Sequence, residues 1–222
     1  MTDLVKHTIR CLNMANTFQT KLPEKIFKME GMSGIKTRMF YNNICSLDRP
    51  IEYLEVGTWK GSSICSAMHC NPKCNGTVIE NWSLFNGPKD EFFKNLEEFN
   101  LQDSVTVYEE DFFKFDISKL EKKIDIYLYD GCHEYDSHVK GITHIWPALA
   151  DNCIIMVDDW SATHIRDATI QGLKQVGANV LESFEIIYTT DGSHTPIEIA
   201  RREFWNGIGI FIVSKGQEPL GN

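Results

Sequence analysis

The sequence predicts one α/β domain built on a doubly wound, mostly parallel sheet with helices on both faces. Its 222 residues are enough for one well-buried domain. Strand-like and helix-like segments alternate between residues 51 and 176, which is typical of a parallel sheet. The last two strand-like segments have no helix between them, so the final strand is expected to be antiparallel. We therefore expect seven strands, the last of them antiparallel.

The expected elements follow from hydrophobic spacing. Two weakly amphipathic segments, 3–18 and 36–47, are expected to form an N-terminal helical cap within residues 1–48. The core is expected over residues 51–214, with strands at 51–56, 76–80, 104–109, 124–130, 153–158, 185–189 and 208–213. Helices are expected at 58–69, 89–100, 134–149 and 162–176. Because no repeat, linker or low-complexity tract interrupts the chain, residues 1–222 are expected to form one domain.

Composition narrows the function classes. The formal net charge is −9, and such an acidic chain disfavours nucleic acid and anionic lipid as partners. No apolar run is long enough to span a bilayer, and the first residues lack the pattern of a signal peptide. The seven cysteines are scattered, which favours reduced thiols and a cytoplasmic protein.

One cysteine cluster has to be weighed against a zinc site. Cys65, His69, Cys70 and Cys74 carry metal-binding side chains at short spacing. Zinc sites usually pair two such knuckles, and only one half is present here. We therefore favour buried or idle thiols over zinc.

Polar residues follow the first three core strands, where open α/β sheets bind ligands. Glu55, Gly57 and Gly61 surround a turn that opens a helix, and glycines there let a ligand approach the backbone. Glu80 ends the second strand, where a carboxylate can accept both hydroxyls of a ribose. Asp111 follows the third strand and could accept an adenine amino group. Each feature alone is weak, but their order predicts a nucleoside-binding edge.

Three carboxylates follow the fourth and fifth strands. Asp130 ends one strand, and Asp158 and Asp159 end the next. Adjacent parallel strands would bring them together, and clustered carboxylates repel one another unless a cation neutralises them. Mg²⁺ with oxygen ligands is the expected answer. The alternative is that one aspartate caps the following helix while another is solvated.

Taken together, these features resemble the class I, Rossmann-like methyltransferases that use S-adenosylmethionine (SAM), especially the metal-dependent small-molecule O-methyltransferases of the catechol and macrocin type. The resemblance covers about residues 30–214, including a closing strand at 204–213. It implies methyl transfer to a hydroxyl of a small molecule, assisted by a divalent metal at Asp130, Asp158 and Asp159. It also implies a cofactor site made of Glu55, Gly57, Thr58, Trp59, Gly61, Ser62, Glu80, Asn81, Trp82, Asp111, Phe112 and Asp130.

Two departures from the family pattern bear on catalysis. Trp59 stands where the commoner loop has a glycine. His133 stands three residues after Asp130, where catechol-type enzymes keep a lysine base. A histidine can act as general base near neutral pH, so His133 and Asp130 are the expected catalytic residues. His133 could equally be a metal ligand or a bystander bonded to Glu134, and His164 is the next candidate for the base.

Two rival functions remain open at this point. One is a SAM-binding regulatory protein without catalysis, favoured by the missing lysine and opposed by the carboxylate set. The other is a dinucleotide oxidoreductase, which fits poorly because the loop lacks the G-x-G-x-x-G pattern. The expected partner is a small-molecule acceptor, whose identity the sequence does not indicate; a homodimer also remains open.

Overall fold

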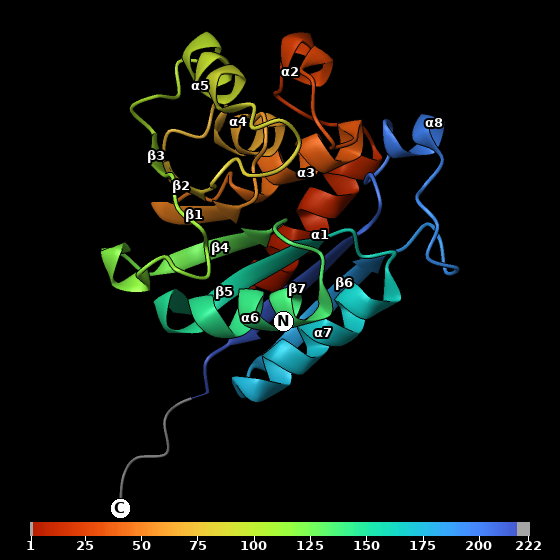
Figure 1. Cartoon of the computed structure of the whole chain (residues 1–222). Helices are drawn as coiled ribbons and strands as arrows, with labels where there is room; N and C mark the ends of the chain where they lie inside the picture. The colour runs from red at the N-terminus through yellow and green to blue at the C-terminus, as the bar shows by residue number, and fades with distance from the viewer. Residues whose placement is uncertain (1, 217–222) are drawn as a thin grey trace, which may run out of the picture.

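The computed structural model describes residues 2–216, and a seven-stranded sheet runs through it (Figure 1). The strand order is β3-β2-β1-β4-β5-β7-β6. β1 to β5 are parallel, whereas β7 is antiparallel to both β5 and β6. The strands are β1 Ile51–Val56, β2 Cys74–Ile79, β3 Val105–Tyr108, β4 Ile124–Tyr129, β5 Leu149–Asp158, β6 Asn179–Ile186 and β7 Ile208–Ser214. The predicted fold class is confirmed.

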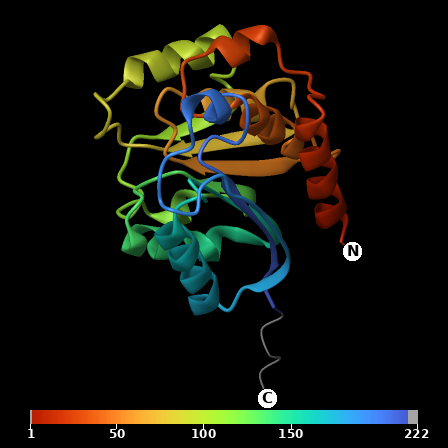
Figure 2. The ribbon, with the colours of Figure 1, turned by 90° about the vertical axis from the view of Figure 1, so that its right-hand side faces the viewer.

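Helices cover both faces of this sheet (Figure 2). One face carries α1 Asp3–Asn16, α3 Ile35–Ile44, α4 Ser62–Met68 and α5 Lys89–Glu98, with the short α2 Glu24–Lys28 beside α4. The other face carries α6 Tyr135–Ile145 and α7 Thr163–Gln175. The short α8 Ile197–Ala200 lies between β6 and β7, and two 3₁₀ turns occupy Ile117–Lys119 and Trp146–Ala148. No helix within residues 2–216 is long and apolar enough to cross a membrane.

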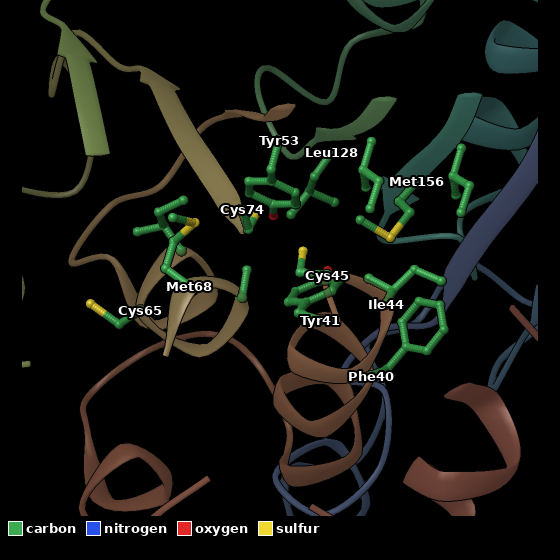
Figure 3. Close-up of a cluster of buried hydrophobic side chains, with 14 of the residues drawn as sticks. Phe40, Tyr41, Ile44, Cys45, Tyr53, Cys65, Met68, Cys74, Leu128 and Met156 are labelled. Carbon is green, nitrogen blue, oxygen red and sulfur yellow. The ribbon is translucent and has the colours of Figure 1, made fainter. Parts of the chain in front are cut away.

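The two cores follow from the alternation of side chains along each strand. Tyr53 packs into the core under α3 and α4, whereas its neighbour Leu54 packs under α6 and α7. Leu128 and Tyr129 of β4 divide in the same way. In Figure 3, side chains of α3 point toward the sheet residues of the first core. Consecutive residues of these strands therefore face opposite layers of helices.

Several predicted boundaries differ from the structure. The expected strand 185–189 is wrong in position, because β6 spans Asn179–Ile186. β6 is an edge strand, mostly exposed and paired only with β7, so burial imposes little pattern on its sequence. The helix expected from residue 58 begins at Ser62, because the glycine loop comes first. β5 begins at Leu149, four residues before the expected start.

Candidate active site

The glycine loop joins β1 to α4 and passes beside the end of β4. Gly57 has a φ of +82°, a left-handed conformation that L side chains rarely adopt. A Cβ at this position would also collide with the backbone oxygen of Asp130. Trp59 holds a φ of +48° without being glycine, which marks local strain of the kind often found at binding sites. The loop is therefore packed directly against the residue that follows β4.

Glu80 ties this loop to the end of β2. Its Oε2 accepts hydrogen bonds from the backbone N–H groups of Thr58 (3.0 Å) and Trp59 (3.3 Å). Its Oε1 accepts from the N–H of Trp82 (2.8 Å). Each carboxylate oxygen has two acceptor positions, so Glu80 keeps capacity for a ligand hydroxyl. The structure places this predicted residue at the loop, while its ribose contact stays a prediction.

The other residues predicted after β2 stabilise the turn that leaves the strand. Trp82 is 7% exposed, its ring lies 5.2 Å from that of Phe92, and its Nε1 donates to the Trp59 carbonyl (2.9 Å). Asn81 accepts a hydrogen bond from the N–H of Ser83 through Oδ1 (3.0 Å). These contacts account for both side chains within the fold, so their contact with the cofactor also stays a prediction.

The residues predicted after β3 lie one strand further out. The Oδ1 of Asp111 accepts from the N–H of Phe113 (3.0 Å), and its Oδ2 lies 3.4 Å from the Nζ of Lys114. Phe112 is buried, with its ring 6.0 Å from that of Tyr129. Asp111 is thus partly occupied by its own turn, and its adenine contact is not tested by these distances.

Glu55 is buried beneath the loop rather than presented to solvent. Its side chain is fully inaccessible and accepts hydrogen bonds from the Tyr53 hydroxyl (2.9 Å) and the Ser63 hydroxyl (2.5 Å). Burial raises the pKa of Glu55 to about 7, and the Ser63 bond partly opposes that rise. Ser63 was not predicted, although its place two residues after Gly61 in a helix start is a usable signal. Glu55 therefore supports the loop from below.

The predicted carboxylates meet at the carboxyl ends of β4 and β5, as the pairing of these strands requires. His133 lies between two of them. Its Nε2 is 3.5 Å from Oδ1 of Asp130, and its Nδ1 is 3.1 Å from Oδ2 of Asp159. Asp159 has a φ of +53°, which turns it out of the strand direction of Asp158. His133 thus bridges the carboxylates of two loops.

The crowding of these side chains shifts their pKa values. Burial raises the pKa of Asp130 to about 6, while the hydrogen bond to His133 opposes the rise. Burial and the charge of Asp130 raise the pKa of Asp158, whose Oδ1 has no hydrogen-bond partner among the described residues. The hydrogen bond to Asp130 raises the pKa of His133 to about 9. His133 is therefore a cation at neutral pH in this arrangement.

Three further side chains surround the acidic end. Tyr41 of α3 is 2% exposed, and its pKa is raised by burial and then by the charges of Asp158 and Asp130. His138 of α6 is buried 6.0 Å from the His133 ring, and burial lowers its pKa to about 3. The Nε2 of His164 is 2.9 Å from the His133 carbonyl oxygen. Tyr41 gives no signal in the sequence, because only the packing of α3 brings it here.

The cysteine cluster is not assembled as a metal site. Cys65 and Cys74 are buried, whereas Cys70 is exposed. Within residues 2–216, no three or more His, Cys, Asp or Glu side chains are arranged to hold a metal ion. The aspartates around His133 are among the side chains that are not arranged in this way.

Comparison with known proteins shows a similarity over the part of the chain that holds this site. Residues 54–160 match a sequence model described as "Methyltransferase domain". This stretch is therefore similar to methyltransferase domains. It contains both the glycine loop and the carboxylates around His133. No curated protein matches the sequence.

Several solved methyltransferase structures share the fold of this protein over nearly the whole chain. The O-methyltransferase TomG of Streptomyces achromogenes, solved with SAM, has a TM-score of 0.62 at 14% identity, covering 97% of this chain and 100% of that one. The SAH-bound methyltransferase PaMTH1 of Podospora anserina has a TM-score of 0.57 at 14% identity, with coverages of 97% and 89%. An O-methyltransferase of Bacillus cereus with SAH has a TM-score of 0.54 at 13% identity, with coverages of 97% and 92%. At these identities the likeness shows that the fold is shared.

Proposed function

We propose that the protein transfers a methyl group from SAM to a hydroxyl of a small molecule. The observation that carries the proposal is the meeting of two features at one sheet edge. The loop clamped by Glu80 lies against the backbone of Asp130, and Asp130 in turn contacts His133. Similar folds solved with SAM or SAH support the choice of cofactor. A cationic sulfonium also suits an edge that carries several carboxylates.

SAM supplies a methyl group on a positively charged sulfur. In the proposed reaction the acceptor oxygen attacks the methyl carbon, the carbon–sulfur bond breaks, and the sulfur leaves as a neutral thioether. His133 takes the hydroxyl proton, and Asp130 and Asp159 hold its ring in place. Only neutral imidazole accepts a proton, and the pKa of His133 is about 9. The rate should therefore rise with pH until about 9.

A divalent cation is the finer part of the proposal. Carboxylates of Asp130, Asp158 and Asp159 have the donor chemistry that Mg²⁺ prefers, and the buried Oδ1 of Asp158, which has no hydrogen-bond partner among the described residues, could accept a cation. Bound Mg²⁺ would supply a charge that lowers the pKa of an acceptor hydroxyl. It would compete with His133 for the same carboxylates. Asp159→Ala should weaken Mg²⁺ binding while leaving SAM binding intact; equal Mg²⁺ affinity in both proteins would remove the metal from the proposal.

The proposal is tested first by binding and then by turnover. Calorimetry should detect SAM and SAH but not NAD, in the presence and absence of Mg²⁺. With a panel of hydroxyl acceptors, His133→Ala should lower turnover by at least about a hundredfold without loss of SAM binding, because a general base contributes about 10² to 10⁴ in rate. His164→Ala tests the next candidate for the base in the same assay. If His133→Ala keeps the normal turnover and pH profile, the proton leaves by another route.

One observation favours a second candidate, a SAM-binding protein without catalysis. His133 is protonated at neutral pH while it bridges the two carboxylates, and in that form it cannot act as a base. Binding of SAM without methyl transfer to any acceptor up to about pH 9 would favour this candidate.

A further inference from the structure

Arg38 is a buried cation without an anionic partner. It lies on α3, is 3% exposed, and donates hydrogen bonds only to neutral oxygens. Its Nε donates to the carbonyl (3.1 Å) and hydroxyl (3.0 Å) oxygens of Ser33, and its Nη1 to the carbonyls of Ile26 (2.5 Å) and Met29 (2.9 Å). No carboxylate in residues 2–216 forms an ion pair with it. Burying an unpaired charge costs free energy, so a bound anion would stabilise this arrangement.

Two other largely buried cations, both lysines, are each paired with a carboxylate. Lys36 is largely buried and lies 2.6 Å from a carboxylate oxygen of Glu203. Lys60 is similarly buried and lies 2.8 Å from a carboxylate oxygen of Glu30. Both cations thus have an internal counter-charge, whereas Arg38 has none within the described chain. Burial alone also lowers the pKa of Arg38 to about 10, as expected for an uncompensated guanidinium.

The remaining nitrogen of Arg38 lies beside the start of α4. The hydrogen bonds of Arg38 within residues 2–216 use Nε and Nη1, which leaves Nη2 for another acceptor. A Cβ added at Gly31 would lie 3.0 Å from Nη2 and would collide with the hydroxyl of Ser62. The hydroxyl oxygens of Ser62 and Ser33 are 2.9 Å apart. One cationic nitrogen and two hydroxyls therefore gather around the bare backbone of Gly31, which is packed so closely against Ser62 that no side chain fits there.

This cluster is next to the proposed cofactor loop. Ser62 is the first residue of α4 and directly follows Gly61. The methionyl part of SAM carries a carboxylate, whereas its sulfonium and ammonium groups are positive. The carboxylates at the ends of β4 and β5 suit the positive groups, and they would repel the negative one. A separate cationic contact for the carboxylate is therefore needed.

We propose that Arg38 binds the methionyl carboxylate of SAM, together with the hydroxyls of Ser33 and Ser62. The inference rests on the proposed function, because it takes SAM as the ligand of the glycine loop. A guanidinium–carboxylate contact is strong and directional. The same contact supplies the counter-charge that the chain does not provide.

The test compares SAM with decarboxylated SAM, which lacks only this carboxylate, on wild type and Arg38→Met by calorimetry. Loss of a hydrogen bond between charged groups should weaken SAM binding about 10- to 100-fold. Binding of decarboxylated SAM should change by less than about threefold, because it never made the contact. Arg49→Met, which removes an exposed guanidinium elsewhere, is the control. Arg38→Lys keeps the charge without the planar fork and should show a smaller loss that is again confined to SAM.

The experiment distinguishes a failure of the proposed role of Arg38 from a failure of the proposed function. Equal losses for both ligands would mean that Arg38 only braces residues 26–33, which overturns the inference. If Arg38→Met does not fold, the same ligand pair on Arg38→Lys and Ser62→Ala decides by the same criterion. If wild type binds neither ligand, the proposed function fails before the role of Arg38 is reached.

Discussion

Replacing Glu55 by glutamine should change how the stability of the protein depends on pH. The side chain is fully buried, and its pKa is raised from 4.5 to about 7 because burial disfavours the charged form. A carboxyl whose pKa is higher in the folded state stabilises the fold when protonated. That contribution is complete below pH 4.5 and is lost as the pH rises through about 7. Glutamine is neutral at every pH, so Glu55→Gln lacks this dependence.

The size of the effect follows from the two pKa values. With 4.5 in the unfolded chain and about 7 in the folded one, the contribution falls by about 2.5 kcal/mol between pH 5 and pH 8. No discount for solvent screening applies, because the group is inaccessible. Wild type should therefore lose about 2.5 kcal/mol relative to Glu55→Gln over this interval. The new amide also alters the bonds from Tyr53 and Ser63, but that offset is the same at each pH.

Urea denaturation at pH 5, 6, 7 and 8 measures this difference directly. Glu52→Gln is the matched control, because it removes a carboxylate from the same strand that is partly exposed and paired with Lys122. A difference between wild type and Glu55→Gln that stays constant from pH 5 to pH 8 would show that Glu55 is ionised throughout. The buried network beneath the loop would then need another source of charge compensation.

Two other substitutions test the loop and the acidic end. Gly57→Val should weaken SAM binding at least tenfold, about 1.4 kcal/mol, because its side chain would collide with the Asp130 carbonyl; unchanged affinity in a folded variant would refute this. His133→Gln should remove a stabilisation that is present below pH 6.5 and lost as the pH rises through about 9. Because the His133 side chain is 45% exposed, screening should limit its size to about 1 kcal/mol, and parallel denaturation profiles of both proteins would argue against the bridge.

Much of the architecture could be predicted because buried strands require a recognisable pattern of hydrophobic residues. β1 was predicted at Ile51–Val56, where it lies, since both its faces are buried between neighbours. The ends of the parallel strands then placed Glu80, Asp130 and Asp158 at one edge without further information. β6 was misplaced because an exposed edge strand takes its position from pairing with β7 rather than from its own side chains.

The contacts that give the site its chemistry could not be predicted in the same way. The sequence predicts Glu80 as the ribose acid, but it does not predict that the backbone N–H groups of Thr58 and Trp82 donate to its two oxygens. The direction of the His133 pKa shift depended on which carboxylates reach the ring, a matter of a few ångströms. Arg38 and Tyr41 lie on a helix outside the core motifs, and only the packing of α3 brings them close to the loop and the acidic end.

The charge of this sheet edge constrains which ligand the site can take. Glu55, Asp130 and Asp158 stand at the ends of three adjacent strands, and each is buried enough to have a raised pKa. Mutual repulsion and lost hydration both act against their ionisation, and His133 is the cation that contacts Asp130. A positively charged ligand relieves this strain, whereas the pyrophosphate of a dinucleotide adds two negative charges to it. Within the proposed function, the same Coulomb argument that favours the sulfonium of SAM near these strands excludes NAD from them. It leaves the carboxylate of SAM to be neutralised by a separate cation, and Arg38 lies near Ser62 at the start of α4.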